Sequence, residues 1–281
     1  MTKKEIFDFV IVGAGSAGCV LAARLSESGR YSVLLLESGP RDWSPWIHIP
    51  LGFSKLFYHK TLNWMYDSEP ESELNSRCLY QPRGKVLGGT SSINGLMYIR
   101  GNRADYNDWR NLGSEGWGYE DVLPYFKKME NQSRGSDDYH GVSGPLSISD
   151  HPFRHPIGEA ILGAGVDLGY KLNEDFNGSL QDGFGRYQLN TFKRRRHSSA
   201  TAYLASARKR ANLEVRTKSH VTRIIIDKGR AVGIEYINGS ELLSVSARRE
   251  VLLCGGAFNS PQILQLSGIG PGALLQSLGI K

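Results

Sequence analysis

The apolar positions at the start of the chain predict a strand, a helix and a second strand. Residues 9–12 (FVIV) and 33–36 (VLLL) are short apolar runs, which is typical of buried parallel strands. Between them, residues 19–28 carry apolar side chains at helical spacing, and Gly29 ends the pattern. This order predicts the beginning of a doubly wound α/β sheet.

The rest of the chain divides into a helical middle and a strand-rich end. Helical spacing covers 102–129, with a break at 113–118, and 155–169, which has one apolar face. Turns at 228–229 (Lys-Gly) and 238–239 (Asn-Gly) indicate an antiparallel meander. Apolar or alternating runs predict strands at 146–148, 184–192, 213–215, 221–226, 231–237, 241–245 and 251–254.

The turn after the first strand, residues 13–18 (GAGSAG), has the spacing of a dinucleotide-binding glycine loop. We expect Gly13 to permit the tight turn, Gly15 to let phosphates approach the backbone, and Gly18 to let helix and strand pack closely. The first N–H groups of the helix then attract a pyrophosphate. Glu37 follows Gly18 by 19 residues, where a carboxylate accepts hydrogen bonds from an adenosine ribose. The alternative is an ordinary strand–helix–strand unit whose glycines only permit turning.

A second strand–glycine–helix junction lies near the end of the chain. Residues 251–254 run into two glycines and Ala257, which we expect to add a backbone contact to the dinucleotide. Ser260 and Pro261 have the residue types of a helix N-cap and first helical position, so we expect the helix to begin there.

Two segments allow two interpretations each. Residues 39–83 are rich in aromatic residues but have little periodicity, so they either cover a cofactor or pack against the core. Residues 84–95 concentrate Gly, Ser, Thr and Asn at the start of a short helix. These residues either donate to an anion or an electron-rich ring, or they cap that helix.

Composition narrows the class of protein. The 281 residues suffice for one large domain or two smaller ones, and 40% of them are hydrophobic. Three separated cysteines and seven scattered histidines lack metal-ligand spacing, so we expect neither a disulfide framework nor a metal site. No run approaches the roughly 18 apolar residues of a membrane span. We therefore expect a cytoplasmic protein, and peripheral association with a membrane stays open.

Positive charge is densest in two runs, Lys193–Arg196 and Arg208–Arg210, within a net charge of +6. A nucleic-acid-binding protein would combine such runs with aromatic residues or a recognition fold. We therefore expect no nucleic-acid partner. The runs are interpreted as solvated basic surface or as arginines near a cofactor phosphate.

Three motifs occur in order along the chain. They are GAGSAG at 13–18, GKVLGGTSSINGLMYIRG within 84–107, and GAFNSPQILQLSGIG at 256–270. Together they resemble the glucose–methanol–choline (GMC) family of flavin oxidoreductases, in particular its bacterial choline-dehydrogenase-like alcohol dehydrogenases. The resemblance covers essentially the whole chain. It implies a Rossmann-like doubly wound FAD-binding domain with a small antiparallel β-meander, interrupted by the first part of an α+β substrate domain.

The resemblance also implies the domain limits and the cofactor site. Residues 1–150 and 196–281 would form two parts of the FAD-binding domain, and 151–195 a substrate-domain segment. The loop 87–97 would follow the pyrophosphate, ribityl chain and isoalloxazine, and Val221 would reach the adenine through its backbone. The implied FAD-binding residues are Gly13, Gly15, Ser16, Ala17, Gly18, Glu37, Ser38, Arg83, Leu87, Gly89, Thr90, Asn94, Gly95, Leu96, Met97, Val221 and Ala257.

The implied FAD is noncovalent. Some relatives attach the flavin through a histidine one residue before the motif asparagine, and Ile93 occupies that position here. The implied activity is oxidation of a primary alcohol to an aldehyde, with hydride passing to flavin N5 while a histidine takes the hydroxyl proton.

The family's catalytic histidine lies in a C-terminal half that the 281 residues do not include. We therefore expect no catalytic residue in this chain and no turnover by the chain alone. We expect His48, His59, His151 and His155 to be loop or surface residues. Three alternatives stay open: a choline dehydrogenase of the same family, a flavin-binding module that needs a separate C-terminal chain, and an NAD-linked or structural Rossmann protein. The residues do not indicate the particular alcohol, the electron acceptor or the oligomeric state.

Overall fold

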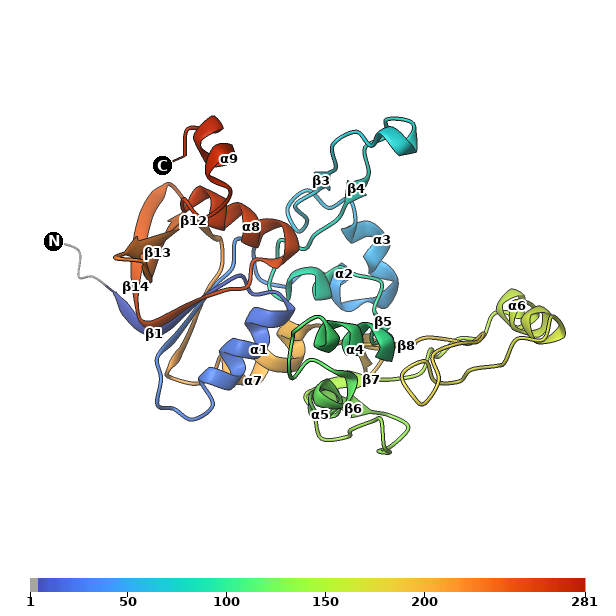
Figure 1. The fold of residues 1–281 in the computed structure, drawn as a ribbon. Helices are drawn as coiled ribbons and strands as arrows, with labels where there is room; N and C mark the ends of the chain where they lie inside the picture. The colour runs from blue at the N-terminus through green and yellow to red at the C-terminus, as the bar shows by residue number, and fades with distance from the viewer. Residues whose placement is uncertain (1–4, 281) are drawn as a thin grey trace. The chain divides into compact units, whose positions relative to one another are not determined.

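The computed structural model describes residues 5–280, which form two compact units (Figure 1). One unit runs to Asn94 and resumes at Ser198, and the other is Gly95–His197. The second unit therefore begins well before residue 151, where we expected the substrate-domain segment to start, and ends close to the expected 195. The difference arises because the strand just after Asn94 pairs with residues 188–189, which closes the second unit at both ends.

The first unit is built on a six-stranded sheet in the order β11-β2-β1-β14-β13-β12. Neighbours from β11 to β14 are parallel, and β14, β13 and β12 are antiparallel, so the predicted parallel sheet and meander are confirmed. The strands are β1 Ile6–Val12, β2 Val33–Leu36, β11 Leu213–Arg216, β12 Ser219–Asp227, β13 Arg230–Asn238 and β14 Glu241–Leu253.

Strand β14 joins two segments, 241–245 and 251–254, that the pattern predicted as separate strands. Its first half pairs with β13 and its second half with β1. The polar residues between the two segments interrupt the apolar pattern but not the strand. One of them, Arg248, lies at the surface with Nη1 2.7 Å from Oδ1 of Asp8 on β1.

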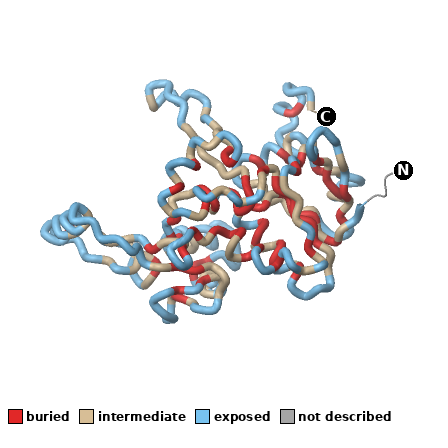
Figure 2. The backbone as a smooth tube through the Cα atoms, turned by 180° about the vertical axis from the view of Figure 1, so that it is seen from behind, coloured by how far each residue is buried: buried red, intermediate tan, exposed pale blue. Residues whose placement is uncertain are grey.

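The parallel strands send successive side chains to opposite faces of the sheet, and each face has its own apolar core. In Figure 2 much of this sheet is coloured as buried. Ile11 and Leu35 pack on one face with α1 and η4. Val10 and Leu34 pack on the other face, to which α8 contributes Ile263. The other elements of this unit are α1 Ser16–Leu25, α2 Pro45–His48, η1 Pro50–Gly52, α3 Phe53–Leu56, β3 Tyr66–Asp67, η2 Ser72–Leu74, β4 Tyr80–Gln81, η3 Gly89–Ser92, η4 Ala200–Leu204, α7 Ala205–Ala207, α8 Gly256–Leu266 and α9 Gly272–Ser277.

Helix α8 begins at Gly256, so the prediction that it starts with Ser260 as N-cap is wrong. Gly256 has a φ of 85°, a left-handed conformation that turns the chain into the helix directly after β14. Pro261 then lies inside the helix, where it removes one backbone donor.

The second unit contains short elements joined by long connections. The predicted helical stretch 102–129 with its central break is confirmed as α4 and α5. Helix α6 is also present, but its apolar positions are exposed, with Ile157 at 64% and Ile161 at 56% (Figure 2). The elements are β5 Met97–Tyr98, α4 Arg103–Asn111, α5 Tyr119–Met129, β6 Glu130–Gln132, β7 Leu146–Ile148, α6 Pro156–Asp167, β8 Gln188–Leu189, β9 Thr191–Phe192 and β10 Arg195–Arg196.

Candidate functional site

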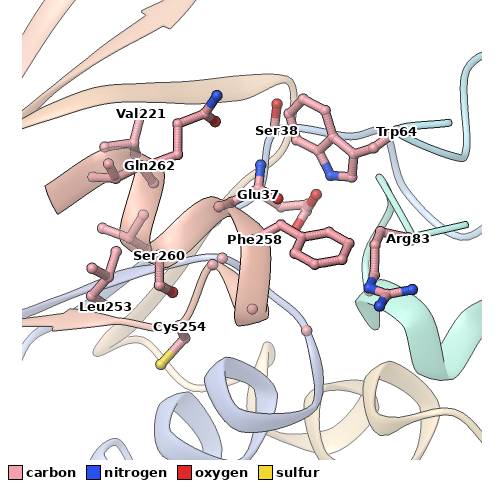
Figure 3. Close-up of a pocket in the computed structure, with 18 of the residues that line it drawn as sticks. Glu37, Ser38, Trp64, Arg83, Val221, Leu253, Cys254, Phe258, Ser260 and Gln262 are labelled. Atoms are coloured by element: carbon pink, nitrogen blue, oxygen red, sulfur yellow. The ribbon is translucent and has the colours of Figure 1, made fainter. Parts of the chain in front are cut away.

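A cavity of about 580 Å³ lies in the first unit (Figure 3). Val12, Leu36 and Leu253, the last residues of β1, β2 and β14, form part of its wall. Ligands of open α/β sheets bind in the crevice outside the carboxyl ends of the strands. The cavity therefore occupies the position where this fold class binds nucleotides.

The glycine turn after β1 lies against the start of α1. Gly13 has a φ of 96°, and a Cβ there would lie 2.5 Å from the carbonyl oxygen of Cys254. A Cβ at Gly18 would overlap the carbonyl oxygen of Gly13, so helix and strand approach as closely as predicted. At Gly15 a Cβ would meet no atom within 4 Å, which leaves the backbone open on that side.

Helix α1 starts at Ser16 without a side-chain cap, and Ser16 and Ala17 line the cavity. The first N–H groups of a helix lack intrahelical acceptors and carry the positive end of the helix dipole. The start of α1 therefore presents backbone donors suited to an anion.

Glu37 is buried at the edge of the cavity, with its carboxylate directed toward the glycine turn. Oε2 accepts a hydrogen bond from the Ala14 N–H at 2.9 Å, and Oε1 accepts one from the Gly39 N–H at 2.8 Å. Burial raises the pKa of Glu37 to about 7, although both backbone donors and the Lys85 charge favour the ionised form. A further hydroxyl donor in the cavity would favour the carboxylate in the same way.

The loop 84–95 packs on the glycine turn. The Gly88 N–H donates to the Ala14 carbonyl at 2.8 Å, and a Cβ at Gly89 would lie 2.7 Å from the Cα of Gly15. Gly89 and Thr90 line the cavity. The two glycine-rich segments are therefore held in close backbone contact.

Two hydroxyl groups of this loop donate to carbonyl groups of the loop itself. Ser91 Oγ donates to the Gly88 carbonyl at 2.6 Å, and Ser92 Oγ donates to the Leu87 carbonyl at 2.7 Å. The short helix η3 that follows Gly88 has no side-chain cap, so the capping interpretation of this loop is wrong.

Three aromatic side chains in the cavity wall were not predicted as site residues: Trp64, His220 and Phe258. His220 Nδ1 lies 3.1 Å from the predicted site residue Ser38, at its Oγ. Burial and the Lys85 charge lower the pKa of His220. The aromatic content of segment 39–83 was a signal for Trp64. Phe258 lies within the motif at 256–270 and His220 directly precedes the predicted site residue Val221, but neither was singled out.

Arg83 belongs to the same wall, and its guanidinium carbon lies 4.5 Å from the centroid of the Phe258 ring (Figure 3). Segment 39–83 contributes Trp64 to the cavity wall, while Ile47, Leu56 and Leu62 form an apolar cluster. Packing against the core is therefore confirmed, and the covering of a cofactor stays a prediction. Trp43, by contrast, is 75% exposed.

Most of the predicted cofactor residues come together around the cavity. They are Gly13, Gly15, Ser16, Ala17, Glu37, Ser38, Arg83, Gly89, Thr90, Val221 and Ala257. Gly18 and Leu87 are buried behind this surface, and Asn94 does not line it. Gly95, Leu96 and Met97 belong to the second unit. The roles of all these residues stay predictions.

Within residues 5–280, no cluster of three or more His, Cys, Asp or Glu side chains could hold a metal ion. Over the same range, no helix combines the length and apolar character that crossing a bilayer requires.

The sequence model of the GMC oxidoreductase family matches residues 7–277. The chain belongs to the GMC oxidoreductase family. It is 47% identical to the oxygen-dependent choline dehydrogenase of Rhizobium meliloti (strain 1021), over 97% of this chain and 50% of that protein. The enzyme of the same name from Brucella anthropi is 45% identical over 98% of this chain and 50% of that protein. The chain thus spans about half the length of the curated relatives it matches.

Solved structures agree with this assignment. Pyridoxine 4-oxidase from Mesorbium loti superposes with a TM-score of 0.93 at 34% identity, covering 97% of this chain and 54% of that one. Formate oxidase of Aspergillus oryzae RIB40, studied for its FAD modification, superposes with a TM-score of 0.91 at 29% identity, covering 100% and 51%. The Rossmann-like α/β fold class is confirmed.

Proposed function

We propose that the cavity holds the ADP part of a noncovalent FAD. The observation that carries this proposal is the convergence of three features on one cavity: the open backbone at Gly15, the uncapped start of α1 and the buried Glu37. The three suit a pyrophosphate and a ribose whose hydroxyl groups donate hydrogen bonds.

Each residue then has a defined contact. The backbone of 13–18 would bind the pyrophosphate, Glu37 would accept from the adenosine ribose, and Val221 would contact the adenine. Gly89 and Thr90 would bind farther along the cofactor. Arg83 and Phe258 form a cation–π pair at the wall, which would limit solvent access to the bound group.

Glu37→Ala tests the ribose assignment. A charge-assisted hydrogen bond contributes about 1.5–3 kcal/mol, so FAD affinity should fall about tenfold to a hundredfold in a fluorescence titration. Glu27→Ala is the matched control, because Glu27 is exposed beyond the end of α1 and pairs only with Arg24 across the surface. Unchanged FAD affinity of Glu37→Ala would contradict the proposal.

The noncovalent attachment is supported by the position of Ile93. Its side chain is buried in the apolar cluster of Ile47, Leu56, Leu62 and Val86 and carries no nucleophilic atom. Acid precipitation of the flavin-loaded protein should release yellow FAD into the supernatant. Colour retained in the washed pellet would contradict this assignment and direct attention to the cysteines and His197.

For the whole protein we propose the oxidation of a primary alcohol to its aldehyde. FAD supplies the two-electron acceptor for such a reaction. The family assignment supports this activity, and the 47% identity to a choline dehydrogenase favours choline as the second, narrower candidate. A flavin-binding module that works with a separate C-terminal chain is the third.

Anaerobic mixing of the FAD-loaded whole protein, and in parallel of the 281-residue chain with and without a separate C-terminal chain, with choline, pyridoxine, formate and simple primary alcohols separates these candidates. Bleaching of the flavin absorbance by choline alone supports the narrower candidate, and bleaching by several primary alcohols supports the broader one. Bleaching only after a C-terminal chain is added supports the module. An FAD-loaded protein that no alcohol bleaches under either condition would contradict alcohol oxidation.

We also propose a cytoplasmic setting. Cys19, Cys78 and Cys254 are all free thiols, which suits a reducing compartment. Fractionation of producing cells, with antibody detection of the chain, tests this directly.

A further inference from the structure

The hairpin of β9 and β10 has a turn whose backbone is unusual for its residues. Phe192 pairs with Arg195, so Lys193 and Arg194 form a two-residue connection. Their φ values are 49° and 63°. Two-residue hairpin turns with both φ values positive favour Asn-Gly, because other side chains are strained there. The chain therefore keeps two long cationic side chains at positions that disfavour them.

These cations are directed to solvent. Lys193, Arg194 and Arg195 are exposed, and none of the ion pairs found among residues 5–280 includes them. Phe192 is 48% exposed, and the Lys193 Nζ lies 5.3 Å from the centroid of its ring. The hairpin tip thus combines an exposed aromatic ring with three cations that have no ion-pair partner among residues 5–280.

The second basic run is arranged differently. Arg210 is directed inward, where its Nη1 lies 2.8 Å from Ser26 Oγ. Arg208 and Lys209 are exposed on helical and turn backbone, and neither has a positive φ. Neither basic run lines the 580 Å³ cavity of the first unit. The phosphate-binding interpretation of the two runs therefore has no support in that cavity.

We propose that the hairpin tip, defined as Phe192, Lys193, Arg194 and Arg195, binds the surface of an anionic lipid bilayer. Strained positions that persist indicate a functional constraint. Cations next to a bilayer are attracted by anionic headgroups, and an aromatic ring beside them can enter the interface. A single-stranded nucleic acid would also use the cations and would stack a base on the ring, so binding to DNA is an outcome that the test separates from binding to a bilayer.

Vesicle flotation tests the proposal with the full chain. Vesicles of pure phosphatidylcholine are compared with vesicles that contain about 30% of the anionic lipid phosphatidylglycerol, each at low and at high salt. We expect binding only to the anionic vesicles, and loss of that binding at high salt. Each surface cation adds about fivefold to the binding constant.

Lys193→Asn combined with Arg194→Gly removes two cations and installs the preferred turn sequence. Binding should fall about 30-fold, while thermal stability should stay equal or rise. Arg208→Ala combined with Lys209→Ala removes the same charge elsewhere and should change binding much less. Phe192→Ala should also weaken vesicle binding.

Equal losses in the two double variants would overturn the proposal, because net charge alone would then explain binding. Absence of binding to anionic vesicles would overturn it too. Binding to duplex or single-stranded DNA that exceeds binding to the anionic vesicles would overturn it in favour of a nucleic-acid surface.

Discussion

The two units of the chain bury different kinds of side chain. The sheet-containing unit is held by apolar clusters on both faces of its sheet, with residues such as Ile11 and Leu34 fully buried. Gly95–His197 instead buries charged groups, among them Arg100, Glu130 and His140. The stability of the first unit therefore depends mainly on apolar burial. The stability of the second unit also depends on buried ion pairs, and loss of one partner leaves the other charge uncompensated.

The charged cluster of the second unit is centred on His140. Nδ1 lies 3.0 Å from Glu130 Oε1, and Nε2 lies 2.8 Å from Asp175 Oδ2. Arg100 Nη2 lies 2.8 Å from Glu130 Oε2. Both ring nitrogens face carboxylates, so the geometry selects the imidazolium form, in which both nitrogens donate.

Among the variants of the two units, Glu130→Gln should have the largest effect on stability, and that effect should fall on the second unit. The change leaves Arg100 and His140 buried with less compensating charge, and breaking a buried pair in this way typically costs about 3–5 kcal/mol. We expect hydrogen exchange to accelerate throughout Gly95–His197, whereas the strands of the first unit change little.

The control is Glu27→Gln, which removes an exposed pair with Arg24 and should cost less than about 1 kcal/mol. If Glu130→Gln accelerated hydrogen exchange equally in both units, the buried ion pairs would not stabilise the second unit in particular.

Next in size is the pH dependence of the second unit. Burial alone would lower the pKa of His140, but the Asp175 and Glu130 carboxylates outweigh it and raise the pKa to about 9. The resulting stabilisation is complete below the ordinary pKa of 6.5 and is lost as pH rises through 9, up to about 3 kcal/mol. Hydrogen exchange between pH 6 and 10, corrected for intrinsic rates, measures it.

The matched variant for that measurement is His140→Gln, in which the second unit should no longer lose stability between pH 6.5 and 9. A parent protein with a flat profile over that range would show that His140 is not charged when the unit is folded.

The first unit should lose stability in an earlier pH window, through Glu37. Its pKa is raised to about 7 in the folded state, so the unfolded chain ionises first and stability falls between about pH 4.5 and 7, again by up to about 3 kcal/mol. Glu37→Gln should remove this loss. Saturating FAD should reduce it in the parent, because ribose hydroxyl donors favour the carboxylate. A profile that neither change alters would contradict the buried position of Glu37.

Features that lie within short stretches of chain could be predicted from residue types and spacing alone. The strand–glycine–helix order at 9–28, the carboxylate at Glu37 and the meander turns depend on neighbouring residues, so periodicity and turn chemistry sufficed to predict them. The family motifs added the candidate cofactor residues, most of which line one cavity.

Which residues from distant parts of the sequence share a surface or a core became known only from the three-dimensional structure. His220 and Phe258 reach the cavity wall from separate elements, and Glu130 meets Arg100 across 30 residues of sequence. Hydrophobic periodicity does not identify such residues, because their contacts join segments that are far apart in the sequence, and a polar residue is expected at the surface unless its buried partner is known. The start of α8 at Gly256 likewise depends on a backbone conformation that the residues permit but do not require.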